Sequence, residues 1–334
     1  LSICIPTYNR NESLKNCISS INKIINKKKI KINIIITDNS NNDIVLKIKK
    51  KLINISKYKI IFLKEKKRGV VYARNKFLKK IKNINPDYIC FFDDDCTIDK
   101  YWIKNTFKII DTKKADVVTG PQLYIGSLKR KIYNYSQIFE KKYWNNKTQI
   151  VNWAASNNVI LDYKIIKKNK LFFDHNLNKF GVGEDQLFFL NISKIGYKIY
   201  WSKDVKVYEK IHKHRQNYKW LIERSYRLGV LGHYLDKNQY GSLSGLFLNY
   251  LKSIYYLSKS IISILCWNNN YVEKMIRLGV VRMELMNTVR DCVGERVFLC
   301  IESTRLYSLN GFCKVKAEWF SSQQLKCFGL NVAW

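Results

Sequence analysis

Residues 88–95 read Tyr88-Ile89-Cys90-Phe91-Phe92-Asp93-Asp94-Asp95. Five apolar residues in succession are typical of a strand covered on both faces of a parallel sheet. Three carboxylates come directly after them, and open α/β sheets bind their ligands at the carboxyl ends of the strands. We therefore expect a buried strand that carries an acidic cluster into a ligand site.

Strand and helix patterns alternate on both sides of this stretch over the first 120 residues. Strand patterns lie at 3–5, 32–36, 59–63, 87–92 and 115–119. Helix patterns lie at 11–25, 43–53, 70–82 and 99–111. All three prolines of the chain, Pro6, Pro86 and Pro121, fall at the ends of predicted elements, where proline is tolerated. This order predicts an α/β fold with a mostly parallel central sheet and flanking helices.

The second half of the chain is less regular. Residues 122–182 are rich in Tyr, Trp and Asn and show no clear periodicity. Later patterns predict a helix over 184–195, strands over 197–201 and 205–208, and a helix over 216–229 closed by Gly229. Residues 243–267 are mostly apolar but carry Lys252 and Lys259 on one helical face, which favours an interfacial amphipathic helix over a membrane span.

The chain is strongly basic, with 60 Lys and Arg against 26 Asp and Glu, a net charge of +34. Such a surface attracts nucleic acid, anionic lipid or phosphorylated substrates, although a bias toward A/T-rich codons is an equal explanation. The nine cysteines are odd in number and include no Cys-x-x-Cys pair, which indicates a reducing compartment. We find no secretory signal pattern and expect a cytoplasmic protein.

Polar clusters come after the predicted strands or open a helix at four places. They are Pro6-Thr7-Tyr8-Asn9-Arg10, Thr37-Asp38-Asn39-Ser40, Asp93-Asp94-Asp95 and Gly183-Glu184-Asp185. Successive carboxylates repel one another, and a hard divalent cation, Mn²⁺ or Mg²⁺, relieves this repulsion while neutralising a donor diphosphate. On an extended backbone Asp93 and Asp95 would share one side and Asp94 the other. The alternative is a solvated acidic loop or a helix N-cap.

The other candidate residues each allow a structural explanation. Asp38 is suited to contacting a nucleoside, but it is also a common turn residue. Arg74 either faces a nucleotide or lies on a solvated helix face. Asp185 would take the proton from an acceptor hydroxyl, with Glu184 as its rival, although the helix dipole alone favours acids at this position. After a later strand, Arg215 would meet phosphate.

Taken in order, these clusters and the segment Gly69 to Asn75 resemble the family 2 glycosyltransferases of the GT-A fold. The resemblance runs from Ser2 to about Gly229. It implies a GT-A nucleotide-diphospho-sugar transferase fold, with Asp38 and Arg74 at the base and Asp93 and Asp95 at the ribose and the metal. It also implies that Asp185 is the catalytic base of an inverting displacement. The predicted donor contacts are Pro6, Thr7, Tyr8, Arg10, Asp38, Arg74, Asp93, Asp94, Glu184 and Arg215.

The sequence departs from this family at the predicted metal site. Many relatives have Val-Tyr-His after the later strand, where this chain has Val207-Tyr208-Glu209 with His212 just beyond. The third protein ligand, beside Asp93 and Asp95, is therefore either Glu209 or His212. The chain also lacks the Gln-x-x-Arg-Trp motif of processive relatives, which favours transfer of a single sugar. The segment Val207 to Gly229 is similar to bacterial exopolysaccharide β-glucosyltransferases.

We therefore predict an inverting hexosyltransferase that moves a sugar from a UDP-sugar to an acceptor hydroxyl in cell-surface polysaccharide or glycolipid synthesis. Expected partners are the donor, a saccharide or lipid-linked acceptor and the anionic inner face of the cell membrane, but no nucleic acid. Two alternatives stay open, a basic nucleic-acid-binding module and an inactive GT-A scaffold.

The expected domains are set by the change in pattern along the chain. A catalytic domain spans 1–230, with a nucleotide-sugar half over about 1–120 and an acceptor half over about 121–230. A helical, membrane-interfacial region spans 231–286, and a tail without recognisable motifs spans 287–334.

Overall fold

The computed structural model describes residues 1–41, 44–125, 148–179, 181–210, 215–216 and 218–241, with single positions at 244, 247, 250, 251 and 254. Its main sheet has eight strands in the order β3-β2-β1-β4-β9-β6-β10-β8. Their bounds are β1 Ser2–Thr7, β2 Asn33–Asp38, β3 Lys59–Lys64, β4 Tyr88–Phe92, β6 Val117–Thr119, β8 Gln149–Val151, β9 Asn158–Asp162 and β10 Ile199–Trp201.

The first four strands in this order are parallel to one another, and β6 is parallel to β10. Strand β9 runs antiparallel to both β4 and β6, and β8 runs antiparallel to β10. The register pairs Thr7 with Asp38, so the carboxyl ends of β1 and β2 finish level with each other. The predicted α/β fold with a mostly parallel sheet is confirmed.

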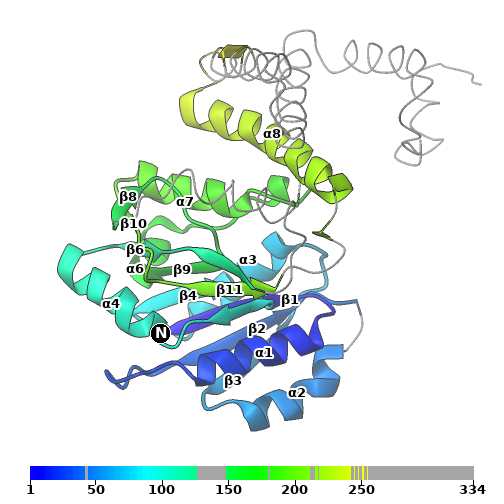
Figure 1. The fold of residues 1–334 in the computed structure, drawn as a ribbon, viewed down its shortest axis with the longest axis vertical. Helices are drawn as coiled ribbons and strands as arrows, with labels where there is room; N and C mark the ends of the chain where they lie inside the picture. The colour runs from blue at the N-terminus through cyan, green and yellow to red at the C-terminus, as the bar shows by residue number, and fades with distance from the viewer. Residues whose placement is uncertain are drawn as a thin grey trace, which may run out of the picture. The chain divides into compact units, whose positions relative to one another are not determined.

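Helices cover the two faces of this sheet (Figure 1). Helices α1 Asn11–Asn22, α2 Ile44–Ile55 and α4 Trp102–Lys113 supply apolar residues to one core, and α3 Val70–Ile81, α6 Tyr163–Asn169 and α7 Glu184–Lys194 supply the other. Strand β1 shows how the cores are separated, because Ile3 and Ile5 lie in the first core and Cys4 in the second. This alternation results from the period of two in a strand and explains the continuous apolar runs of the sequence.

A second, three-stranded sheet carries part of the candidate site. Strand β11, Val207–Lys210, lies between β5, Cys96–Ile98, and β7, Gln122–Ile125. The antiparallel pairing of β11 with β5 sets Glu209 opposite Cys96. Since β5 begins directly after the acidic triplet, this pairing delivers Glu209 to the same place as Asp95.

Several elements differ from the sequence prediction, among them β9 and α8, Tyr218–Tyr240. Strand β9 lies within 122–182, where the sequence showed no periodicity, and it is fully buried apart from its last residue. Its apolar run is only Val159 to Leu161, too short to be separated from loop by pattern alone. Helix α8 continues through Gly229 because Leu231 packs against Leu177 and Leu187, which offsets the cost of about 1 kcal/mol of a helical glycine.

The helices and strands do not test the predicted domain boundaries. Helix α8 runs through residue 230, and the boundary at 230 stays a prediction. The tail over 287–334 and most of 243–267 lie outside the described residues. Within the described ranges, no helix has the length and apolar character needed to cross a membrane.

Asn158, the first residue of β9, ties the main sheet to neighbouring loops. Its Oδ1 accepts from Trp102 Nε1 at 2.8 Å, and its Nδ2 donates to the Val205 carbonyl at 2.7 Å and the Pro121 carbonyl at 3.2 Å. The side chain is fully buried. Its loss would leave the indole N–H and the Val205 carbonyl without these partners in a dry environment.

We therefore expect Asn158→Ala to lower the free energy of unfolding by about 3 kcal/mol, since each stranded buried polar group costs about 1–3 kcal/mol. Urea denaturation measures this change. The control is Asn105→Ala, because Asn105 donates to the Asp204 carbonyl at the surface and its loss should cost under about 1 kcal/mol. Equal losses in the two variants would show that Asn158 has no special structural role.

Candidate active site

A cleft of about 1250 Å³ opens where β1 and β4 end and where α3 and α7 begin. Most of the predicted site residues line it together: Pro6, Thr7, Tyr8, Arg10, Arg74, Asp93, Asp94, Asp95, Glu184, Asp185, Glu209 and Arg215. Asp38 does not line it, and His212 lies outside the described residues. Positions far apart in the sequence are thus brought to one place, as expected for the carboxyl edge of an α/β sheet.

The backbone turns at the acidic triplet, directly after the end of β4. Asp94 and Asp95 form a turn between β4 and β5, so the backbone is not extended there and the alternation expected of the triplet is wrong. Arg10 Nη1 bridges both, at 3.0 Å from Asp94 Oδ1 and 2.6 Å from Asp95 Oδ2. Thr7 Oγ1 donates to Asp94 Oδ2 at 2.7 Å. Burial raises the pKa of Asp94 to about 6, with Arg10 opposing the shift.

Arg74 joins the two sides of the cleft. Its Nη1 donates to Glu184 Oε1 at 2.6 Å and its Nη2 to Asp93 Oδ1 at 3.1 Å. Arg74 and Glu184 are buried, whereas the Asp93 side chain is 36% exposed. Burial alone would lower the pKa of Arg74, but Glu184 and Asp93 raise it, so the guanidinium is permanently charged. Arg74 is therefore not on a solvated helix face, and it lines the cleft instead.

Asp185 faces the cleft from the first turn of α7. Its Oδ2 accepts from the Ser156 backbone N–H at 3.2 Å, and its Oδ1 accepts from the Gln186 N–H at 2.8 Å. Burial, and then repulsion from Glu184, raise the pKa of Asp185 to about 6. A carboxyl group with such a pKa can accept a proton near neutral pH.

Gly183 sets the direction in which α7 begins. Its φ is +84°, a left-handed conformation that glycine adopts without strain. A Cβ at this position would lie 2.1 Å from a methyl carbon of Leu231 on α8. Glycine is therefore required at this position for two reasons, the left-handed backbone and the close approach of Leu231. Both constraints hold Glu184 and Asp185 at the cleft.

Glu209 and Arg215 form the opposite wall. Arg215 Nη1 donates to Glu209 Oε1 at 3.0 Å, and its Nη2 lies 3.9 Å from Asp95 Oδ2. The Arg215 guanidinium carbon also lies 5.9 Å from the centre of the Trp220 ring. Burial, and then repulsion from Asp95, raise the pKa of Glu209 to about 8. Asp95 therefore disfavours the charged form of Glu209, even with Arg215 beside it.

The residues present suit a divalent cation bound jointly with a diphosphate. Within the described part of the chain, no three His, Cys, Asp or Glu side chains are grouped closely enough to hold a metal ion by themselves. The donor set of Asp93, Asp95 and Glu209 is nevertheless all oxygen and mutually repulsive. Mg²⁺ and similar hard cations commonly bind to one or two carboxylates and complete their shell with phosphate oxygens and water. The assignment of these three ligands stays a prediction.

Asp38 lies behind the cleft wall. Its carboxylate accepts from the Ser40 N–H at 2.9 Å and from Lys64 Nζ at 2.8 Å, and it is nearly fully buried. This geometry agrees with the turn-residue alternative. The neighbouring Asn39 does line the cleft, and its side chain accepts from the Gly69 N–H at 2.7 Å and donates to the Lys67 carbonyl. Asn39 thereby holds the loop that leads into α3.

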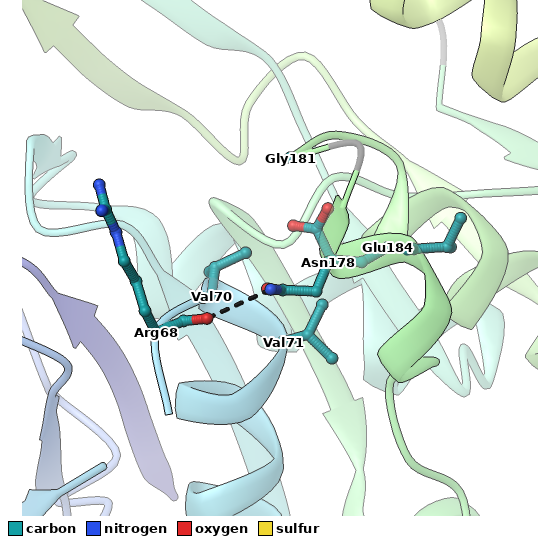
Figure 2. Close-up of a pocket in the computed structure, with 8 residues that line it drawn as sticks. Arg68, Val70, Val71, Asn178, Gly181 and Glu184 are labelled. Atoms are coloured by element: carbon teal, nitrogen blue, oxygen red, sulfur yellow. Dashed lines mark hydrogen bonds between the residues drawn. The ribbon is translucent and has the colours of Figure 1, made fainter. Parts of the chain in front are cut away.

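That loop also borders a smaller pocket of about 250 Å³ beside the cleft, shown in Figure 2. Asn178 Nδ2 donates to the Arg68 carbonyl at 3.2 Å across it, next to Val70 and Val71. Gly69 has φ +137°, and a Cβ there would overlap the Asn178 amide. The Arg68 guanidinium itself turns toward the cleft, where it lies 5.3 Å from the Tyr8 ring.

Several residues of the cleft wall were not predicted from the sequence. They include Arg68, Gln122, Asn152, Trp153, Asn157 and Trp201. Most of them come from loops or short strands in or near the region 122–182, where no periodic pattern identifies a surface. The Trp and Asn enrichment of that region was the one available signal, since such side chains are frequent in ligand-binding clefts.

Comparison with known proteins identifies relatives of this chain. The family profile described as Glycosyl transferase family 2 matches residues 2–171. The Glycosyltransferase GlyA of Streptococcus pneumoniae serotype 4 is 25% identical over 120 residues, which are 36% of this chain and 16% of that protein. The match therefore spans only a small part of this curated relative.

Solved structures resemble the fold at low sequence identity. S. aureus TarS has a TM-score of 0.51 and 18% identity, with 86% of this chain and 54% of that chain covered. The mannosyltransferase PcManGT from Pyrobaculum calidifontis, in complex with GDP-Man and Mn²⁺, has a TM-score of 0.57 and 14% identity, with 87% of each chain covered. GalNAc-T7 with UDP, GalNAc and Mn²⁺ has a TM-score of 0.51 and 14% identity, with 69% and 47% covered. These are GT-A glycosyltransferases, and the predicted GT-A fold is confirmed.

The buried Arg74–Glu184 pair generates a prediction about stability. Removing one partner of a buried pair leaves the other charge uncompensated, so we expect Arg74→Met to lower the free energy of unfolding by about 3 kcal/mol. In the double variant Arg74→Met/Glu184→Gln the total loss should be smaller than the sum of the single losses by about 1 kcal/mol or more. Urea denaturation of all variants measures this coupling.

The surface pair of Lys28 and Asp111 provides the control, because both side chains are 56% exposed. Lys28→Met should cost under about 1 kcal/mol. Additive losses for Arg74 and Glu184 would contradict the view that the two side chains act as one buried unit.

Proposed function

This chain belongs to glycosyl transferase family 2, and on this basis we propose that it transfers the sugar of a UDP-sugar to an acceptor hydroxyl with inversion. One observation carries the proposal. A single cleft holds the acidic turn Asp93–Asp95, suited to a cation and diphosphate, and also Asp185, suited to a proton acceptor. Arg74 connects the two groups through Asp93 and Glu184.

The donor side of the proposed reaction is the wall formed by the ends of β1 and β4. Asp93, Asp95 and Glu209 would hold Mn²⁺ or Mg²⁺, which neutralises charge on the diphosphate as it departs. Arg10 lies beside the carboxylates of Asp94 and Asp95 and keeps the turn in place. Tyr8 and Arg68 lie at the same wall and offer a ring and a guanidinium to a nucleobase.

The acceptor side of the proposed reaction depends on Asp185. Inversion needs one in-line displacement, and an acceptor hydroxyl must lose its proton as it attacks. Glu184 is the weaker candidate for this base, because its carboxylate already accepts a hydrogen bond from Arg74 at 2.6 Å. Asp185 is bound by backbone N–H groups and lines the cleft, so its position is fixed while its side chain faces the cleft.

The donor nucleotide is open to direct assay. PcManGT was solved with GDP-Man and GalNAc-T7 with UDP, so these relatives differ in their nucleotides. A panel of UDP-, GDP- and dTDP-sugars, each with Mn²⁺ or Mg²⁺, should give nucleotide release with UDP-sugars above all. Release from GDP- or dTDP-sugars instead would correct the nucleotide. No release from any donor with any saccharide acceptor would favour the inactive scaffold.

We expect Asp185→Asn to lower turnover by about 10²- to 10⁴-fold, the usual contribution of proton abstraction. Donor affinity should be retained, because the predicted metal ligands and all the predicted nucleotide contacts except Glu184 lie on other elements. Glu184→Gln is the matched variant and should reduce turnover less. Turnover and UDP affinity are measured for both proteins. Unchanged turnover in Asp185→Asn, or an equal loss of donor affinity and rate, would remove Asp185 from this role.

The pKa of Asp185 also predicts a pH profile. A general base works only when deprotonated, so turnover should rise with pH through an apparent pKa of about 6 and level off above it. In Asp185→Asn this rise should vanish from the residual activity. Steady-state turnover from pH 5 to 8 tests this, and an unaltered profile in the variant would assign the titration to another group.

Peripheral binding to an anionic membrane on the cytoplasmic side forms the second part of the proposal. Phe247, Tyr250, Leu251 and Ile254 come after α8 at helical spacing, and each is at least 45% exposed. The region 243–267 adds Lys252 and Lys259, and the chain carries a net charge of +34. Apolar side chains beside lysines favour docking on anionic lipid. This location would suit a lipid-linked acceptor.

Vesicle flotation tests membrane docking. The protein should float with vesicles containing phosphatidylglycerol but not with phosphatidylcholine vesicles, because each basic residue near an anionic surface contributes about 1 kcal/mol. Phe247→Ser/Leu251→Ser should reduce flotation, while Ile150→Ser, at an exposed apolar residue on β8, serves as the control. Equal binding to both vesicles, or none, would contradict the membrane proposal without affecting the glycosyl transfer.

A further inference from the structure

Arg215 lies between the predicted metal ligands and an aromatic ring. Its two terminal nitrogens lie 3.0 Å from Glu209 Oε1 and 3.9 Å from Asp95 Oδ2, and its guanidinium carbon lies 5.9 Å from the Trp220 ring centre. The two carboxylates are 7% and 8% exposed, while the Arg215 side chain is 22% exposed. The guanidinium thus balances charge that a divalent cation would otherwise balance.

We infer that Arg215 is an exchangeable counter-cation. In the metal-free protein it pairs with Glu209 and Asp95, and arrival of a divalent cation with the diphosphate releases it to bind the diphosphate. The inference rests on the proposed function, since it takes these carboxylates as cation ligands. It makes Arg215 a positioning residue that couples metal binding to donor binding.

Competition for one carboxylate explains the release. A divalent cation on Glu209 would lie close to the guanidinium that now occupies Oε1, and two positive groups repel at this range in a poorly solvated site. The cation carries the larger charge and keeps its ligands at shorter distances than a hydrogen bond does. Arg215 is the group that must leave.

Arg10, in contrast, is fixed. Its Nη1 is bound to Asp95 Oδ2 and also to Asp94 Oδ1, and Asp94 in turn accepts from the Thr7 hydroxyl at 2.7 Å. Arg215 approaches the same Asp95 oxygen only to 3.9 Å, so that contact is the weaker one. The geometry therefore selects Arg215 as the mobile partner and Arg10 as the permanent one.

Trp220 keeps the released guanidinium near the cleft. Arg224 lies 5.2 Å from the centre of the same ring, so two guanidinium groups share one indole. All three residues line the cleft. A planar guanidinium fork matches the paired oxygens of a diphosphate, and stacking on an aromatic ring limits the directions in which it can move. The released Arg215 would therefore stay at the cleft wall, where the donor is proposed to bind.

The test compares Arg215→Gln with Arg224→Gln. Each variant removes one positive charge and one guanidinium from the Trp220 ring, but of these two arginines only Arg215 pairs with Glu209 and Asp95. Binding of Mn²⁺ alone is measured by electron paramagnetic resonance, and binding of UDP in saturating Mn²⁺ by calorimetry. Melting temperatures confirm that each variant is folded.

Arg215→Gln should bind Mn²⁺ alone about tenfold more tightly, because the guanidinium that competes for the carboxylates is gone. The same variant should bind UDP in saturating Mn²⁺ about tenfold more weakly, which is the usual effect of losing one charge-assisted hydrogen bond. Arg224→Gln should change Mn²⁺ affinity much less. Arg215→Lys should show the same two signs at smaller size, and it keeps the test valid if the Gln variant is unfolded. Loss of both affinities, or no change in Mn²⁺ affinity, would overturn the exchange.

The two proposals fail in different ways. If the wild-type protein releases no nucleotide from any donor, the proposed function is wrong, while the arm with Mn²⁺ alone still reports on Arg215. If nucleotide release is normal but Mn²⁺ affinity in Arg215→Gln is unchanged or weaker, the exchange is wrong and the glycosyl transfer stands.

Discussion

The buried guanidinium of Arg74 is the interaction that holds the cleft together. It lies between Glu184 on α7 and Asp93 after β4, and so joins the two halves of the site. Its Nε is buried without a hydrogen-bond partner among the described residues, and its guanidinium carbon lies 5.5 Å from the Phe173 ring centre. Burying charges costs free energy that pairing only partly offsets. Such a costly arrangement is explained if it positions acids for a reaction, since an apolar core would be simpler to stabilise.

Side chains of both charges line the cleft, in a chain that is strongly basic as a whole. Six acids line it, namely Asp93, Asp94, Asp95, Glu184, Asp185 and Glu209, and five arginines stand against them, namely Arg10, Arg68, Arg74, Arg215 and Arg224. The whole chain, by comparison, carries +34. A basic protein draws anionic ligands toward it, but the acidic turn would repel a diphosphate at close range. A divalent cation would resolve this conflict, and the proposed release of Arg215 would assist it.

The strands of the parallel half could be predicted from the sequence because their apolar runs are continuous and end in polar clusters. Most of the residues that line the cleft at the ends of β1 and β4 could be predicted for the same reason, since the loops after parallel strands meet at the carboxyl edge of the sheet, but Arg68 was missed. Strand β9 was missed because three apolar residues carry no period, and the helix end at Gly229 was wrong because a tertiary contact of Leu231 overrides the local propensity. The pairing of Arg10 with both Asp94 and Asp95 required knowledge of the turn, which residue types alone do not give.

The proposed reaction requires Asp95 to belong to a cation site that holds the donor diphosphate. Calorimetry of UDP with Mn²⁺ on Asp95→Ala tests this requirement, with Asp111→Ala as a control that removes an exposed carboxylate on α4. We predict that UDP affinity in Mn²⁺ falls by at least about a hundredfold in Asp95→Ala and stays normal in the control. Such a loss is larger than the usual effect of removing a residue that only hydrogen-bonds to a metal ligand. Unchanged UDP–Mn²⁺ affinity in a folded Asp95→Ala protein would contradict the cation site.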